Sequence, residues 1–251
     1  MIQPGPVAGK PVRERALLAV TLLVGFFASY FLIGLSVDPA RARSVRIPFD
    51  DAIPFVPESI FLYAWVYTAM LFPLFVVRCP VLFRRAALAY ALVLAVSFVT
   101  FALYPVTAIG LRSDLSGLDP GRFAHWGIVL TYTLDPPYNL FPSVHLAIAT
   151  LAALVSWKAR TAYGAVAFGF VALIAVAICT TKQHFVVDGF VGVALALFAY
   201  ALVVHPYRSA SGVAVAYGWR GPASYLVLHS LVYLGLFGAF LAGFDIEGGD
   251  R

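Results

Sequence analysis

The chain has 251 residues, of which 62% are hydrophobic and only 12% are charged, and its mean hydropathy is +0.90. Soluble domains of ordinary composition do not reach this balance, so the composition excludes a soluble globular protein and predicts an integral membrane protein. The net charge of +5 follows from the membrane topology described below, and we expect no nucleic-acid partner.

Seven apolar stretches are long enough, or nearly so, to cross a hydrocarbon core of about 30 Å as helices. They run over residues 16–35, 58–77, 86–104, 143–157, 161–179, 184–204 and 222–243. No internal repeat or soluble domain interrupts them. We therefore predict one all-α integral membrane domain over residues 1–251, a polytopic helical bundle with six core transmembrane helices and a seventh at the C-terminus.

The first apolar stretch follows Lys10, Arg13 and Arg15, as the core of a secretory signal would. Its length of about twenty residues exceeds the usual signal core of roughly 7 to 15 residues. We predict a retained span, and cleavage would leave the remaining topology unchanged.

Basic residues set the expected orientation, because short cytoplasmic loops carry an excess of Lys and Arg. A cytoplasmic N-terminus places ten of the seventeen Lys and Arg in short inner segments. These ten are Lys10, Arg13, Arg15, Arg78, Arg84, Arg85, Lys158, Arg160, Arg208 and Arg220. We expect a protein of the plasma (inner) membrane, with its outer loops facing the periplasm or exterior.

The unusual sequence lies in two outer loops. Residues 36–57 contain four Pro, which stop helix continuation and favour an extended crossing of the surface. Residues 105–142 form the longest loop, and "GRFAHWGIVLTYTL" within it suits a short interfacial helix.

Two short motifs place ionisable residues at the outer ends of spans, where such residues usually serve a function. In "NLFPSVHLAIAT", Asn139 or Ser143 is expected to cap the fourth span, with His145 in its first turn. In "TTKQHFVVDGF", His184 is expected to begin the sixth span, with Asp188 four residues later on the same helical face.

The fourth and sixth spans begin on the same side of the membrane, so two imidazoles, one carboxylate and two helix N-termini converge there. Helix N-termini suit a phosphate, and Lys182 adds a full cation. This set fits phosphoryl transfer without a metal: a His activated by an Asp attacks phosphorus, and a second His protonates the leaving oxygen. No cofactor is expected.

The motifs resemble the type 2 phosphatidic acid phosphatase superfamily. The residues that match its second motif, P-S-x-H, and the end of its third, H-x-x-x-D, are Pro142, Ser143, His145, His184 and Asp188. The stretch "TTKQHFVVD" is similar to the branch of inositol phosphorylceramide synthases, and the resemblance covers roughly residues 50–204, the expected catalytic core.

The resemblance implies a role for each matched residue. His184 would be the nucleophile, oriented by Asp188, and His145 would be the general acid. Ser143 and Lys182 would contact the phosphate.

The sequence departs from the superfamily pattern in two places. The first motif, K-x-x-x-x-x-x-R-P, has no match, but "YPVTAIGLR" lies in the right place and makes Arg112 the candidate phosphate-binding cation. The Ser-Arg that precedes the third motif falls on Ala177 and Ile178, and Lys182 is the expected substitute.

The combined interpretation is a membrane enzyme that handles a lipid phosphate ester at the outer face through a phosphohistidine. Its partners would be a lipid phosphate, the membrane and a polar acceptor. If water resolves the intermediate, the enzyme is a phosphatase. If an inositol, sugar or sphingolipid hydroxyl does so, it is a phosphotransferase, and the sequence leaves both open.

Other interpretations predict different features. A transporter or channel, a non-catalytic lipid-binding protein and a zinc site are the alternatives, although neither motif offers a third strong zinc ligand. We interpret Asp135 and Asn139 as turn or capping residues, with contact to a polar acceptor as the alternative. Tyr63 and Tyr67 are assigned to packing and the aromatic belt.

Overall fold

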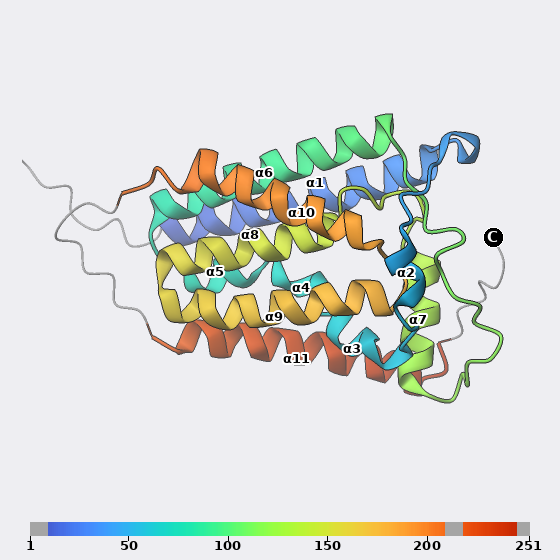
Figure 1. The fold of residues 1–251 in the computed structure, drawn as a ribbon. Helices are drawn as coiled ribbons and strands as arrows, with labels where there is room; N and C mark the ends of the chain where they lie inside the picture. Colours follow the sequence, from blue (N-terminus) through green and yellow to red (C-terminus); the bar gives the residue numbers. More distant parts are fainter. Residues whose placement is uncertain (1–9, 209–217, 245–251) are drawn as a thin grey trace, which may run out of the picture.

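The computed structural model describes residues 10–208 and 218–244 (Figure 1). Within these ranges the chain forms helices and no β-strand, which confirms the predicted all-α membrane bundle. The helices long and apolar enough to span a membrane are α1 (Lys10–Ser36), α6 (Pro80–Leu103), α9 (Thr161–Thr180), α10 (Val186–Ala199) with its π-helical continuation η3 (Tyr200–Val204), and α11 (Arg220–Leu241).

The second predicted span, 58–77, is wrong as a single continuous helix. It is divided into η2 (Pro57–Ser59), α3 (Ile60–Tyr63), α4 (Val66–Ala69) and α5 (Phe72–Val76). Several backbone bonds here reach back three residues, such as Thr68 N to Trp65 O at 3.2 Å, so the winding tightens locally. Pro73 also has no N–H to donate to the preceding turn.

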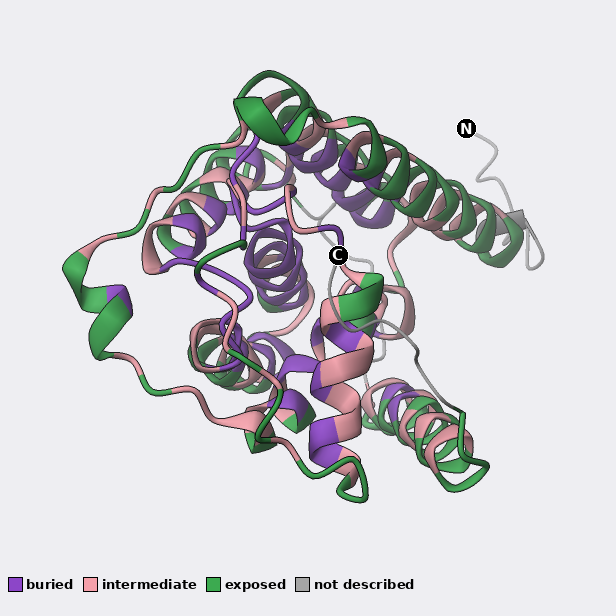
Figure 2. Cartoon of the chain, turned by 90° about the vertical axis from the view of Figure 1, so that its right-hand side faces the viewer, coloured by how far each residue is buried: buried purple, intermediate pink, exposed green. Residues whose placement is uncertain are grey.

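Helix α8 (Val144–Ala159) occupies the centre of the bundle. It packs against α4, α5, α6, α9 and α10, and most of its side chains are buried. Figure 2 shows this helix almost end-on, buried around its circumference, whereas the peripheral helices expose their outer faces. At 16 residues it is about 24 Å long, shorter than α6 and α9, which pack against it.

The two ends of the bundle differ in character. One end, which we call the loop end, carries α2 (Pro48–Ala52), α7 (Phe123–Leu134) and the irregular segments between α1 and α3 and between α6 and α8 (Figure 1). Helix α7 lies across this end, as expected of the predicted interfacial helix. The starts of α6 and α11, the connection from α8 to α9 and the residues after η3 lie at the opposite end (Figure 1). The basic residues in or next to these segments are Arg78, Arg84, Arg85, Lys158, Arg160, Arg208 and Arg220.

The backbone of α10 is in direct contact with the backbone at the start of α8. Ser143 N–H donates to the carbonyl of Asp188 at 3.0 Å. A Cβ at Gly192 would overlap the carbonyl oxygen of Ser143, so only glycine fits there. The N-terminal turns of both helices therefore meet at the loop end.

Replacing Gly192 with Ala should lower the free energy of unfolding by about 1–3 kcal/mol, because the added methyl group forces α10 away from Ser143. Thermal unfolding of the purified protein in detergent measures this. Gly169→Ala in α9 is the matched control, since its Cβ would meet nothing within 4 Å. Equal behaviour of the two variants would contradict the close approach.

Candidate active site

Local sequence fixes the start of α8. Ser143 is the N-cap, and its Oγ accepts a hydrogen bond from Leu146 N at 3.3 Å, as one of the two expected caps. His145 lies in the first turn, as predicted, and is 4% exposed. Asn139, the other candidate cap, instead donates its side-chain N–H to Tyr30 O at 2.7 Å.

His184 does not begin α10, contrary to the sequence prediction. It lies in the turn that joins α9 to α10, whose helix starts at Val186 with Phe185 as N-cap. Lys182 adopts a left-handed conformation in this turn, with φ of 54°, because the chain must reverse direction within a few residues. Asp188 Oδ2 accepts from Phe185 N at 2.9 Å, which fixes the carboxylate beside the turn.

The three predicted catalytic side chains form one buried chain of contacts. His145 Nδ1 lies 2.9 Å from His184 Nε2, and His184 Nδ1 lies 3.4 Å from Asp188 Oδ2. If His184 donates its Nδ1–H to the carboxylate, its Nε2 is an acceptor, and His145 Nδ1 must be the donor. In this tautomer, the lone pair on Nε2 of His184 points away from Asp188 and toward His145.

Arg112, in the loop between α6 and α7, contacts the turn that carries His184. Its guanidinium stacks on the ring of Tyr132 at 4.8 Å and donates to the Tyr132 carbonyl at 2.7 Å. It also donates to the Asp135 carbonyl at 2.9 Å and to Gln183 Oε1 at 3.1 Å. Arg112 therefore contacts the residue immediately before His184.

Tyr132 supports this arrangement as a neutral phenol. Burial raises the pKa of Tyr132 to about 12, so it keeps its proton at neutral pH. Its hydroxyl donates to Thr181 O at 2.9 Å and accepts from Ser113 N at 3.3 Å. The tyrosine thus links the Arg112 loop to the His184 turn.

Two buried donors at this point have no acceptor. They are Nε of Arg112 and Nε2 of Gln183. Buried donors without acceptors are costly, and an acceptor brought by a bound ligand removes that cost. Sequence reasoning did not single out Gln183, although its position directly before His184 was the available signal.

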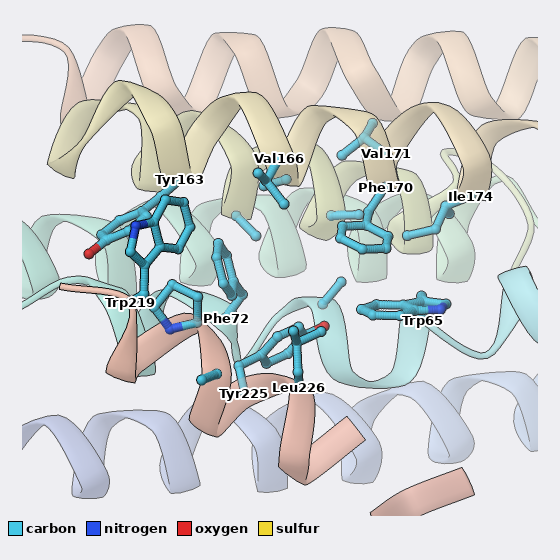
Figure 3. Close-up of a pocket in the computed structure, with 16 residues that line it drawn as sticks. Trp65, Phe72, Tyr163, Val166, Phe170, Val171, Ile174, Trp219, Tyr225 and Leu226 are labelled. Atoms are coloured by element: carbon cyan, nitrogen blue, oxygen red, sulfur yellow. The ribbon is translucent and has the colours of Figure 1, made fainter. Parts of the chain in front are cut away.

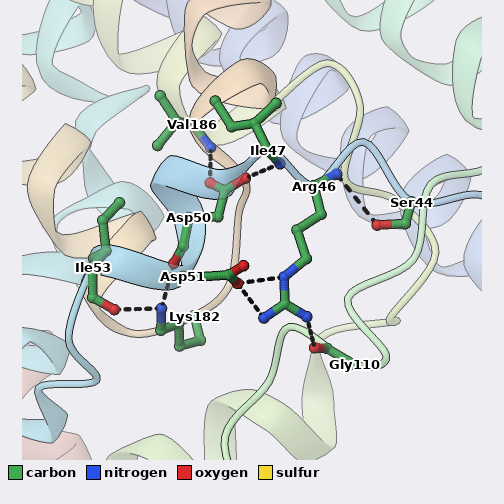
Figure 4. A network of polar contacts seen from close by, with 9 residues as sticks. All are labelled: Ser44, Arg46, Ile47, Asp50, Asp51, Ile53, Gly110, Lys182 and Val186. Carbon is green, nitrogen blue, oxygen red and sulfur yellow. Dashed lines mark hydrogen bonds and ion pairs between the residues drawn. The ribbon is translucent and has the colours of Figure 1, made fainter.

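The Lys182 ammonium group, expected to contact a phosphate, donates to backbone carbonyl oxygens in the structure (Figure 4). Two of its three N–H donors go to the carbonyls of Asp50 at 2.9 Å and Ile53 at 2.6 Å. Asp50 is 2% exposed and accepts from Val186 N and Ile47 N, each at 2.8 Å. Lys182 and Asp50 therefore clamp α2 onto the first turn of α10.

Asp135, interpreted as a turn or capping residue, has a larger role in the structure. Its two carboxylate oxygens accept from the hydroxyls of Tyr30 at 2.8 Å and Tyr63 at 2.9 Å. With His145 it also lines a cavity of about 150 Å³. These partners lie far apart in sequence, which is why local patterns did not reveal them.

A larger cavity, of about 290 Å³, lies between α5, α9 and α11 (Figure 3). Its lining is almost entirely apolar and includes Trp65, Phe72, Tyr163, Trp219 and Tyr225. None of the predicted site residues lines it. This cavity is therefore separate from the predicted site residues at the loop end of α8 and α10.

The residues at the loop end do not form a zinc site. In the part of the chain that the structure describes, no three His, Cys, Asp or Glu side chains gather in a way that could hold a metal ion. The zinc alternative therefore has no ligand set among these residues.

Residues 55–202 match a family model described as the PAP2 superfamily. The match includes all six predicted site residues and omits α1 and α11. No curated protein and no solved structure is significantly similar to the chain.

Replacing Asp50 with Ala should lower the free energy of unfolding by about 1–3 kcal/mol, because the N–H groups of Ile47 and Val186 lose their acceptor. Asp51→Ala is the matched control: Asp51 forms an exposed ion pair with Arg46, which is worth about 0–1 kcal/mol. Thermal unfolding compares them. A larger loss in the Asp51 variant would refute the clamp.

Proposed function

Because this chain belongs to the PAP2 superfamily, which generally comprises phosphatases and phosphotransferases, we propose that it cleaves or transfers the phosphoryl group of a lipid phosphate ester through a phosphohistidine. The observation that supports this most directly is the buried chain from Asp188 through His184 to His145, with two unpaired donors beside it. The two steps described next use these side chains and no metal ion.

The first step uses His184 as nucleophile. Asp188 holds the Nδ1–H, so the Nε2 lone pair attacks phosphorus. An N–P bond forms while the P–O bond to the lipid alcohol breaks, and His145, entering as the imidazolium, gives its Nδ1 proton to the leaving oxygen. The phosphate replaces the hydrogen bond that joins the two rings in the structure.

The phosphate would be held by groups around the two helix starts. Arg112 and Gln183 offer their unpaired N–H groups, and Ser143 lies at the N-terminus of α8, where partial positive charge favours an anion. Lys182 adds charge nearby, while its hydrogen bonds keep the His184 turn in place. These donors stabilise the equatorial oxygens as negative charge redistributes.

The second step decides between hydrolysis and transfer. Neutral His145 takes a proton from the acceptor hydroxyl, whose oxygen bonds to phosphorus as the N–P bond breaks. Water as acceptor makes the protein a phosphatase. An inositol, sugar or sphingolipid hydroxyl makes it a phosphotransferase similar to inositol phosphorylceramide synthases, an alternative favoured by the stretch "TTKQHFVVD".

The charge distribution supports an orientation for this enzyme. The end opposite the site carries the basic residues of the short connections, which the positive-inside bias places in the cytoplasm. The site would then face the periplasm or exterior of the plasma membrane, with the N-terminus in the cytoplasm. Substrate would reach it from the outer leaflet.

His184→Ala should abolish turnover without loss of folding, because no other residue supplies the attacking lone pair. The measurement is phosphate release from a panel of lipid phosphates by purified protein in detergent with EDTA, repeated with inositol and sugars added. Substantial activity in the variant would sink the nucleophile assignment. Binding of lipid phosphates by the native protein without any turnover would instead favour the non-catalytic alternative.

His145→Ala should reduce turnover of alkyl phosphates by about 10²–10⁴-fold, the usual contribution of general acid catalysis. An activated aryl phosphate has a leaving group that needs little protonation, so its turnover should fall much less. The check is the ratio of kcat/KM values for the two substrates. Equal losses on both would remove His145 from the role of acid.

A further inference from the structure

The carboxylate of Asp135 lies at the edge of an apolar bundle, where removing a charged group from water costs free energy. Both of its oxygens are held by phenol hydroxyls, from Tyr30 at 2.8 Å and Tyr63 at 2.9 Å. Arg112 bonds to the backbone carbonyl of Asp135, and no ion pair is formed by its carboxylate among the described residues. Two donors thus orient this negative charge.

The first helix is built to hold this group, although it lies outside the segment that matches the family. Tyr30 of α1 is 4% exposed, and its carbonyl accepts from Asn139 Nδ2 at 2.7 Å. One turn later, a Cβ at Gly34 would lie 2.9 Å from the same nitrogen and would overlap Pro136. Helix α1 is therefore fixed directly on the loop that carries Asp135.

The held carboxylate shares its surroundings with His145. The rings of Tyr30 and Tyr63 meet the imidazole edge to face, with centroids 6.2 and 5.7 Å away. Asp135 and His145 both line the cavity of about 150 Å³, which is large enough for bridging water. Since His184 occupies Nδ1 of His145, the Nε2 atom is the one available to the cavity.

We propose that Asp135, held by Tyr30 and Tyr63, is a positioning residue that stabilises the imidazolium form of His145. This rests on the proposed function. It gives each histidine a carboxylate: Asp188 serves the nucleophile, and Asp135 serves the acid. In the first step the Nδ1 proton of His145 moves to the leaving oxygen as the P–O bond breaks, and in the second it returns from the acceptor hydroxyl as the N–P bond breaks.

A carboxylate that acts through His145 predicts a dependence on the leaving group that packing alone does not. Asp135→Asn keeps the shape but removes the charge. We expect kcat/KM for a long-chain lipid phosphate to fall about 100-fold, and that for 4-nitrophenyl phosphate to fall less than about fivefold. Asp114→Asn, an exposed carboxylate bonded to Ser116, is the control and should change neither rate.

The tyrosines give a second test that does not alter the carboxylate. Tyr30→Phe and Tyr63→Phe each remove one donor and should cause the same selective loss, to a smaller extent. Combined with Asp135→Asn, neither should reduce lipid phosphate turnover further, because residues that act through one another are not additive. Independent, multiplying losses would overturn the proposal.

Failure of this inference is distinguishable from failure of the proposed function. Suppose that the native protein is active and the His184→Ala variant is inactive. Equal losses on both substrates in Asp135→Asn, or unchanged rates in that variant, would then overturn only the inference. A native protein that turns over no phosphate ester would overturn both. If Asp135→Asn does not fold, Tyr30→Phe decides, with thermal unfolding recorded beside the two rates.

Discussion

The contact between the first turns of α8 and α10 is the constraint on which the site depends. The Ser143 N–H to Asp188 carbonyl bond and the bare backbone at Gly192 bring two helix starts together inside an apolar bundle. This contact places His145 beside His184, although the two lie 39 residues apart in sequence. A bulkier residue at the crossing would separate the imidazoles, because the clash is with backbone atoms that cannot rotate away.

At the loop end, hydrogen bonds from several loops keep this contact in place. Lys182 and Asp50 tie α2 to the start of α10, and Arg112 ties the long loop to the turn that carries His184. The buried Lys182, Asp50 and Asp188 side chains each have hydrogen-bond partners, which offset the cost of burying charge in a low-dielectric medium. The resulting site is asymmetric. The guanidinium of Arg112 and the unpaired donors lie at Gln183, whereas the carboxylate of Asp188 contacts His184 and that of Asp135 lines a cavity with His145.

Short sequence motifs predicted the features that depend only on residues close together in the chain. The Ser143 cap and the place of His145 in the first turn follow from P-S-x-H, because capping involves neighbours within three residues. The patterns were wrong where backbone geometry departs from a regular helix. His184 lies outside α10 because Lys182 reverses the chain in a left-handed conformation, and the span over 58–77 is interrupted where bonds shift to three-residue spacing and Pro73 removes a donor.

By itself the sequence determined the membrane class, the all-helical fold and the motifs that carry the candidate chemistry, since hydropathy and residue spacing are properties of the chain alone. Only the tertiary structure decided the partners of the buried charges. It turned Lys182 toward the carbonyls of α2, supplied Gln183 beside Arg112, and joined Asp135 to a tyrosine of α1. Such pairings form only where segments from distant parts of the chain meet at one end of the bundle. A local sequence pattern does not show which distant residues will meet.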